Sequence, residues 1–178
     1  MRGSKVKKDM SVTVKAIEPV KKALREYVNF GIDLYDGNDC FVPSLIFDEI
    51  NTLIPSKNPA FDYCRAQSFM AYRDGKPAGR ITAIINDRLN STTGRKEARF
   101  GFVDFVDDCE VTDALFSAAE QWARDNGMTE MIGPMGFTDM DREGMLVEGF
   151  DEMGTMATIY NYPYYPAHVE RLGYRKDT

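Results

Sequence analysis

The sequence has no long apolar run and no surplus of basic residues, and these two absences exclude two large classes of protein. No apolar stretch approaches the roughly 20 residues that a bilayer span requires, and the N-terminus shows no signal-peptide pattern. The 28 acidic residues outnumber the 22 lysines and arginines, so the formal net charge is −6. A nucleic-acid-binding surface needs clustered basic side chains. We therefore expect a cytoplasmic protein with no membrane or nucleic-acid partner.

Cysteine and histidine are also scarce. Cys40, Cys64 and Cys109 are widely spaced and odd in number, which indicates neither a disulfide framework nor the paired spacing of metal ligands. Cys109 lies among acids, which disfavour the thiolate and with it a nucleophilic role. His168 is the single histidine. The pattern fits a reducing compartment, and the sequence predicts no metal centre.

The length and composition predict one folded domain. With 178 residues, 43% of them hydrophobic, the chain can bury one sizeable core, and a domain of this size removes about 70% of its unfolded surface from water. Residues 1–9 are basic and polar without an apolar period, so we expect a disordered expression tag or leader there. Residues 10–178 are predicted to form the domain.

Hydrophobic periodicity predicts a mixture of strands and helices. Two strand-like runs flank Asp74-Gly75, which is a strong hairpin signal. The clearest helix places Val111, Leu115 and Trp122 on one apolar stripe,. The polar run 87–97 is predicted to be a mobile loop. We expect strands at 11–18, 67–73, 77–86, 99–106, 128–132 and 174–178, and helices at 20–35, 47–54, 111–124 and 167–172.

The segment 133–166 stands apart because it gathers glycine, methionine, acids and tyrosine without a sustained period. Tyrosine joins a large apolar face to a hydroxyl that needs a partner when buried, so a cluster of tyrosines suits either a pocket wall or packing against a sheet. The segment is therefore interpreted either as the lining of a binding site or as an irregular packed connection. The candidate pocket tyrosines are Tyr160, Tyr162 and Tyr164.

Three acids, Asp139, Asp141 and Glu143, alternate within the same segment. Such spacing could gather oxygen ligands for magnesium or calcium. The run lacks the glycine and the terminal glutamate of a known calcium loop, which favours turn-forming and capping roles instead. We keep the three acids as candidate substrate-pocket residues and predict no metal.

The order of the expected elements resembles the GNAT superfamily of N-acetyltransferases. The run YRDGKPAGRITAII resembles the second and third strands of that fold, ALFSAAEQWARDNG resembles its central helix, and PAHVERLGYRKD resembles its late helix and strand. The runs GPMGFTDMDREGMLVEGFD and TMATIYNYPYYP resemble a bacterial group of GNAT-like proteins that are usually longer, so the chain resembles their N-terminal part and ends before the last strand. The resemblance implies an α/β domain with a mixed, mostly antiparallel sheet flanked by helices.

The resemblance also implies acyl transfer from an acyl coenzyme A, such as acetyl-CoA, to an amine. In the superfamily, a glycine-bearing loop before the central helix binds the diphosphate through bare N–H groups. Here Asp108 and Glu110 occupy two of the customary glycine positions, and carboxylates at that place would repel a diphosphate. The candidate cofactor-binding residues are Val106, Asp108, Cys109, Val111 and Thr112.

Catalytic candidates follow from the same resemblance. Many members place a tyrosine four residues before the glycine of the late motif, as the acid for the leaving thiolate. Val169 stands at that position here, and Tyr165 could substitute from one turn earlier. A base is needed for the amine. The base candidates are Glu110, Asp141, Glu143 and His168, although a lone histidine on a short helix is more often a surface or partly packed residue.

Two functional hypotheses remain open at this point. The first is an N-acetyltransferase domain with a degenerate diphosphate loop, whose small-molecule amine substrate would suit the acidic net charge. The second is a non-catalytic GNAT-like binding or structural module of a longer protein. A pocket for a ligand unrelated to coenzyme A is a third, weaker reading, and the sequence leaves homo-oligomerisation open.

Overall fold

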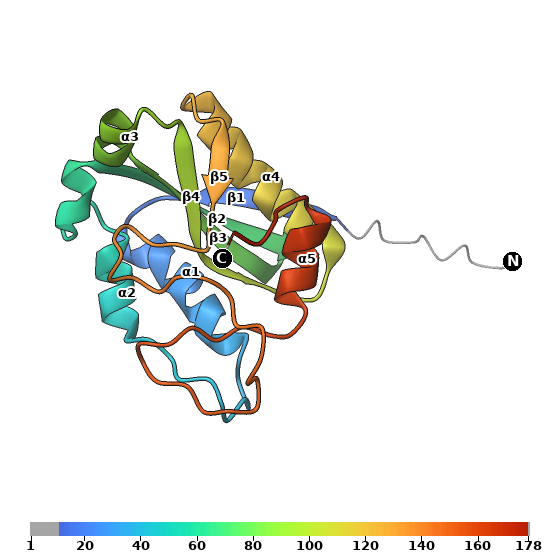
Figure 1. Ribbon diagram of the computed structural model, residues 1–178. Helices are drawn as coiled ribbons and strands as arrows, with labels where there is room; N and C mark the ends of the chain where they lie inside the picture. The colour runs from blue at the N-terminus through green and yellow to red at the C-terminus, as the bar shows by residue number, and fades with distance from the viewer. Residues whose placement is uncertain (1–10, 178) are drawn as a thin grey trace, which may run out of the picture.

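A computed structural model describes residues 11–177, which form one five-stranded sheet with helices on both faces (Figure 1). The strand order is β1-β2-β3-β4-β5, and every neighbouring pair is antiparallel except β4 and β5, which are parallel. The expected α/β class with a mixed, mostly antiparallel sheet is confirmed. The strands are β1 (Val12–Ile17), β2 (Cys64–Arg73), β3 (Lys76–Asn86), β4 (Glu97–Phe105) and β5 (Glu130–Ile132).

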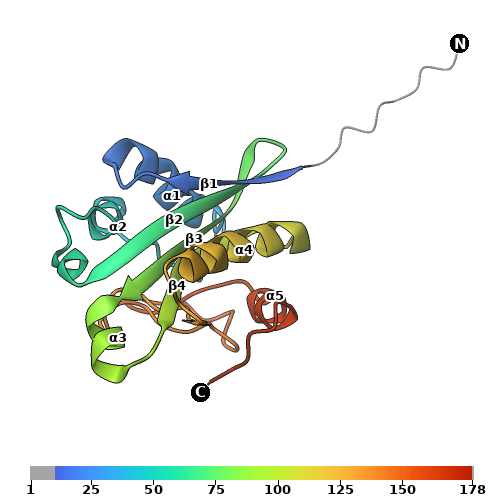
Figure 2. The same cartoon turned by 90° about the horizontal axis from the view of Figure 1, so that it is seen from above.

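The helices divide between the two faces of the sheet (Figure 2). Helices α1 and α2 cover one face, with Leu24, Val28 and Ile50 in the core beneath them. Helix α4 covers the other face, where Leu115 and Phe116 pack on the sheet. The helices are α1 (Lys21–Asp33), α2 (Ile46–Thr52), the 3-10 turn η1 (Pro59–Asp62), α3 (Asp87–Thr93), α4 (Cys109–Asp125) and α5 (Tyr165–Arg171).

Local sequence explains where the central elements turn and begin. Asp74 and Gly75 both adopt positive φ, at 53° and 79°, as a tight two-residue hairpin turn requires. Helix α4 begins at a side-chain cap, because the Asp108 carboxylate accepts hydrogen bonds from the N–H groups of Glu110 and Val111. The hairpin turn thus joins β2 to β3, and the cap sets where α4 begins.

The segment after β5 crosses from the sheet edge to the face that α1 and α2 cover. The side chain of Phe137 is buried in the core beneath those helices. Further along, the amide of Gly154 donates to the carbonyl of Cys40 at 3.1 Å, and Asn38 donates to the Tyr160 hydroxyl at 2.9 Å. In Figure 1 this orange segment lies beside the connection between α1 and α2. Specific hydrogen bonds therefore hold this irregular segment against the connection between α1 and α2.

Two sequence-based expectations are wrong. The run 87–97 is not a loop, because it contains helix α3 and the first residue of β4. The expected strand at 174–178 is absent, since residues 174–177 carry no strand and residue 178 lies outside the described part. The leader expected at 1–9 also lies outside the described residues.

Candidate functional site

A cavity of about 360 Å³ opens between α2, the second half of β4 and the segment after β5. Its walls come from parts of the chain that are far apart in sequence. Helix α2 supplies Asp48 and Glu49, β3 supplies Arg80, and β4 supplies Asp104. The segment after β5 covers the cavity with residues between 134 and 161. The fold therefore brings charged residues of four separate parts of the chain to one cavity.

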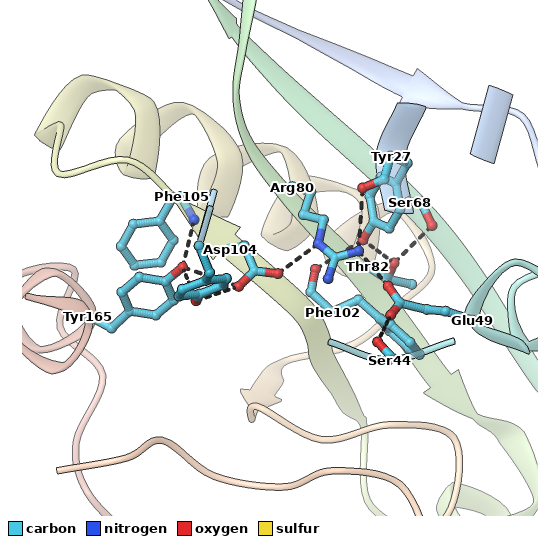
Figure 3. A network of polar contacts seen from close by, with 11 residues as sticks. Tyr27, Ser44, Glu49, Ser68, Arg80, Thr82, Phe102, Asp104, Phe105 and Tyr165 are labelled. Carbon is cyan, nitrogen blue, oxygen red and sulfur yellow. Dashed lines mark hydrogen bonds and ion pairs between the residues drawn. The ribbon is translucent and has the colours of Figure 1, made fainter. Parts of the chain in front are cut away.

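The floor of the cavity is a buried ion-pair network centred on Arg80 (Figure 3). The Arg80 Nε donates to Asp104 Oδ2 at 2.7 Å, and its Nη1 donates to Glu49 Oε1. Ser44 donates to the second oxygen of Glu49 at 2.5 Å. The three charged side chains are only 8–10% exposed. A single guanidinium thus serves two carboxylates that have almost no contact with water.

The charges at this site do not balance. The network holds one cation and two anions, and the whole lining holds four carboxylates against two guanidinium groups, a formal excess of two negative charges. Burial raises the pKa of the Asp104 carboxyl above its ordinary value despite the opposing effect of Arg80. Burial acts in the same direction on Glu49, but Arg80 and Ser44 outweigh it and hold the pKa of that carboxyl low. A cation is the complementary ligand.

The backbone of α1 leaves room for the Arg80 guanidinium. A Cβ atom built on Gly31 would lie 2.1 Å from the guanidinium carbon of Arg80, so any larger residue would displace that group. The carbonyl of Tyr27 accepts a hydrogen bond from Arg80 at 3.3 Å, and the Tyr27 ring lies 5.3 Å from the guanidinium carbon. Helix α1 therefore positions the cation of the network.

Two tyrosines complete the network on the side of β4. The Tyr35 hydroxyl donates to Asp104 Oδ1 at 2.8 Å and lies 2.9 Å from the Tyr165 hydroxyl. Tyr165 also contacts Asp104 Oδ1, at 3.2 Å. Burial raises the pKa of both phenols far above the ordinary value, so both remain neutral hydrogen-bond donors. They hold the Asp104 carboxylate in one orientation.

The rim of the cavity carries exposed apolar side chains beside the exposed carboxylate of Asp48. Leu45, Met140 and Met156 line the opening and are 49%, 90% and 55% exposed. Exposed side chains of this size stand out when they gather at one site. Phe47 and Met153, which belong to the same two segments, are also exposed. The cavity thus joins a buried charged floor to an entrance that carries several large apolar side chains.

The predicted pocket residues separate into two groups. Asp141 and Tyr160 line the cavity, as does the catalytic candidate Tyr165. The Asp141 carboxylate also accepts a hydrogen bond from the amide of Thr138 at 2.9 Å, which is a capping role. The other members do not line the cavity: Asp139 and Glu143 are exposed, Tyr162 donates to the Leu34 carbonyl, and Tyr164 donates to the Phe105 carbonyl.

The remaining catalytic candidates lie elsewhere. Glu110 is an exposed residue at the start of α4, where it pairs with Arg73. His168 is buried on α5, and its ring nitrogens lie 3.1 Å from the Thr112 hydroxyl and 2.8 Å from Asp107. Neither side chain lines the cavity.

Sequence reasoning missed the three residues at the centre of the floor. The available signal was the presence of Arg80 and Asp104 inside runs that otherwise read as buried strands, because an unpaired charge is rarely buried. Glu49 carried no such signal, since an acid in the first turn of a helix is ordinary. Within residues 11–177, no three His, Cys, Asp or Glu side chains are arranged to hold a metal ion, and no helix is long and apolar enough to cross a bilayer.

Comparison with known proteins places this geometry in context. Protein YghO of Escherichia coli strain K12 is 35% identical over 156 residues, which are 88% of the chain and 40% of that protein. The bacterial ceramide synthase of Caulobacter vibrioides is 33% identical over 165 residues, 90% of the chain and 43% of that protein. The chain thus spans about two fifths of the length of these curated relatives. No profile of a known protein family matches it.

A solved structure decides the fold. The tandem GNAT protein from the clavulanic acid biosynthesis pathway superimposes on 94% of the chain with a TM-score of 0.58, at 14% sequence identity. The chain has the GNAT fold. It covers 45% of the tandem protein, which is close to the share of one GNAT unit out of two. The resemblance expected from the sequence is confirmed at the level of the fold.

The GNAT fold implies a coenzyme A diphosphate at the start of α4, and the residues present there do not fit that group. The Asp108 carboxylate already accepts from the amides of Glu110 and Val111, at 2.9 and 3.3 Å. Arg73, the nearby cation, pairs with Asp108 and Glu110. Of the other candidates, Val106 donates its amide to Ala78, and the carbonyl of Cys109 accepts from the Thr112 hydroxyl. A carboxylate therefore already occupies the amides of Glu110 and Val111, where a diphosphate would need free N–H groups.

Proposed function

We propose that this GNAT domain acts in N-acylation and that its cavity binds the amine that accepts the acyl group. The observation that carries the proposal is the excess negative charge buried at the cavity floor, where Glu49 and Asp104 share the single cation Arg80. A protonated amine placed there would restore the charge balance. Burial strengthens such an attraction, because little water is present to screen it.

The arrangement also supplies a proton acceptor for acylation. An amine must lose a proton before its nitrogen can attack an acyl carbonyl, and a raised pKa makes a carboxylate a stronger acceptor for that proton. Burial raises the pKa of Asp104, and the Tyr35 and Tyr165 hydroxyls orient its carboxylate. We assign Asp104 as the base and the two tyrosines as positioning residues.

The apolar rim favours an amine that carries an alkyl chain. Ceramide is the amide of a fatty acid and a long-chain amino alcohol, and one relative is named a ceramide synthase. An amino alcohol of that type would place its ammonium on the floor and its chain across Leu45, Met140 and Met156. The charge distribution of the cavity matches that of such a molecule from floor to rim.

Calorimetric titration with a water-soluble, medium-chain amino diol tests the proposal. We expect saturable binding of the free amine. Its N-acetylated derivative should bind at least about tenfold more weakly, because it has no positive charge to meet the floor. Ethanolamine carries the charge without the chain and should also bind weakly. Equal binding of the free and N-acetylated amino diols would contradict the assignment of the floor as an ammonium site.

A second function, that of a non-catalytic binding module in a longer protein, is favoured by the carboxylate at the start of α4. The two functions separate in one assay that supplies the amino diol together with acetyl-CoA. Thiol release by this chain would support a complete transferase. Amine binding without thiol release would support the module, whose partner domain would then carry the acyl donor.

A further inference from the structure

The outer edge of β4 beyond β5 is a place where strand N–H and C=O groups could meet an acyl donor. Strand β5 pairs only with Glu97, Ala98 and Arg99 of β4. The Phe100 carbonyl already accepts from the Met135 amide at 2.8 Å. The residues of β4 beyond it have no strand on that side, so their outward N–H and C=O groups can attract a partner. A donor lying between β4 and α4 would hydrogen bond to this edge and have its carbonyl polarised by a strand N–H.

In this protein the chain's own hydroxyl groups occupy that edge at Phe105. The Phe105 amide donates to the Tyr165 hydroxyl at 3.1 Å, and its carbonyl accepts from the Tyr164 hydroxyl at 2.7 Å. The Tyr165 ring also stacks on the Phe105 ring, with centroids 4.1 Å apart. Figure 3 shows the Tyr165 hydroxyl between the Phe105 amide and Asp104. Both backbone groups of Phe105 therefore have hydrogen-bond partners, and the Tyr165 ring covers the Phe105 ring.

Helix α5 extends this closure to the start of α4. His168 contacts the Thr112 hydroxyl and the Asp107 carboxylate, and Arg171 donates to Asp113 at 2.7 Å. Together with the Asp108 cap, these contacts join α5 to the first turn of α4. An acyl donor between β4 and α4 would place its diphosphate at the start of α4 and its acyl group beside β4, a course that we call the donor path. Side chains of this same domain thus occupy both of its ends.

We infer that this domain does not hold the acyl donor between β4 and α4, and that the donor for its amine is bound by a second domain. Hydrogen bonds within the domain already occupy the backbone of Phe105 and the amides of Glu110 and Val111, which would otherwise receive the donor. The tandem GNAT protein, of which the chain covers 45%, shows that a second unit of this fold can occur in one chain. Tyr165 therefore lies between the amine cavity and the donor path, since it lines the cavity and its hydroxyl accepts from the Phe105 amide.

Backbone amide NMR tests the closure directly. Addition of about 1 mM acetyl-CoA, enough to half-saturate a site of millimolar Kd, should leave the resonances of Phe105, Glu110 and Val111 unshifted. Saturable shifts of those amides would overturn the inference. The same sample titrated with the amino diol shows whether the amine cavity is functional, so a failure of the proposed function is seen separately.

A matched pair of variants tests the contact at Phe105. Tyr165→Phe removes the hydroxyl that accepts from the Phe105 amide, so hydrogen exchange of that amide should become at least about tenfold faster. Tyr164→Phe removes a hydroxyl that donates to the Phe105 carbonyl, and it should leave the exchange of the amide nearly unchanged. Equal exchange in Tyr165→Phe and in the unmodified protein would overturn the closure.

Full-length Protein YghO allows a test of where the donor lies. A photoreactive acyl-CoA should label peptides outside the part that aligns with residues 11–177 of this chain. Competition with unlabelled acetyl-CoA should remove the label. Competable labelling within the aligned β4 or α4 would overturn the inference.

Discussion

The charge of Asp104 can be removed with little change in shape, and this substitution gives the sharpest test of the amine cavity. In Asp104→Asn, the amide oxygen can still accept from Arg80, and the amide nitrogen can donate to Tyr35 and Tyr165, whose hydroxyls are able to act as acceptors,. Arg80 and Glu49 then form a balanced pair. We expect the stability of the protein to change by no more than about 1 kcal/mol.

The affinity for the amine should change much more than the stability. Two unit charges about 4 Å apart interact by roughly 4 kcal/mol at an effective dielectric constant of about 20, which corresponds to a factor of about 1,000 in Kd. Partial hydration of the ligand reduces this value, so we expect Asp104→Asn to weaken binding of the amino diol by between about tenfold and 1,000-fold. Calorimetry measures the affinity, and thermal unfolding measures the stability.

A matched control separates the local charge from the net charge. Asp113→Asn removes the same charge from an exposed position on α4, and α4 covers the face of the sheet opposite to α1 and α2 (Figure 2). It should bind the amino diol like the unmodified protein. An unchanged affinity in Asp104→Asn, in a protein that remains folded, would refute the role of the cavity floor in amine binding.

Three further predictions concern the same network. Arg80→Met should cost about 3–5 kcal/mol of stability, because it leaves Glu49 and Asp104 buried without their ion-pair partner,. Denaturant unfolding should show a smaller loss of stability at pH 5 than at pH 8, and equal losses would contradict this reason. Gly31→Ala should lower the melting temperature by several degrees, although alanine usually stabilises a helix, since its Cβ would overlap Arg80; an unchanged melting temperature would count against that packing. Amine affinity should fall as the pH drops through the raised pKa of Asp104, because protonation removes the anion. It should also fall as the pH rises toward about 10, where the amine itself loses its proton. A calorimetric affinity that stays constant between pH 4 and 8 would exclude Asp104 as the charged partner.

Most of the fold could be predicted because its strands and long helices show clear periodicity. Helix α3 was missed for a physical reason. None of its residues is buried, so it has no apolar stripe for a periodicity argument to detect. Its signals are the side-chain cap from Asn86 and the left-handed Gly94 at its end. Those two flanking residues, rather than the polar run between them, define the helix.

The site could be predicted only in part because its charged residues come from four separate elements. The unusual segment after β5 does cover the cavity, and Asp141, Tyr160 and Tyr165 line it. The pairing of Arg80 with both Glu49 and Asp104 depends on contacts between residues 24 and 31 positions apart. No spacing rule relates such positions, so the network becomes visible only when the strands are in register.

The buried network and the closed edge of β4 depend on the same tyrosine. The Tyr165 hydroxyl is shared among the Phe105 amide, Asp104 and Tyr35. Withdrawal of this hydroxyl to admit a donor at Phe105 would also release the Asp104 carboxylate from one of its two tyrosine partners. Donor entry along β4 would therefore disturb the base that the amine requires. A donor that reaches the amine from a second domain avoids this conflict, which is why we place the two substrates on different domains.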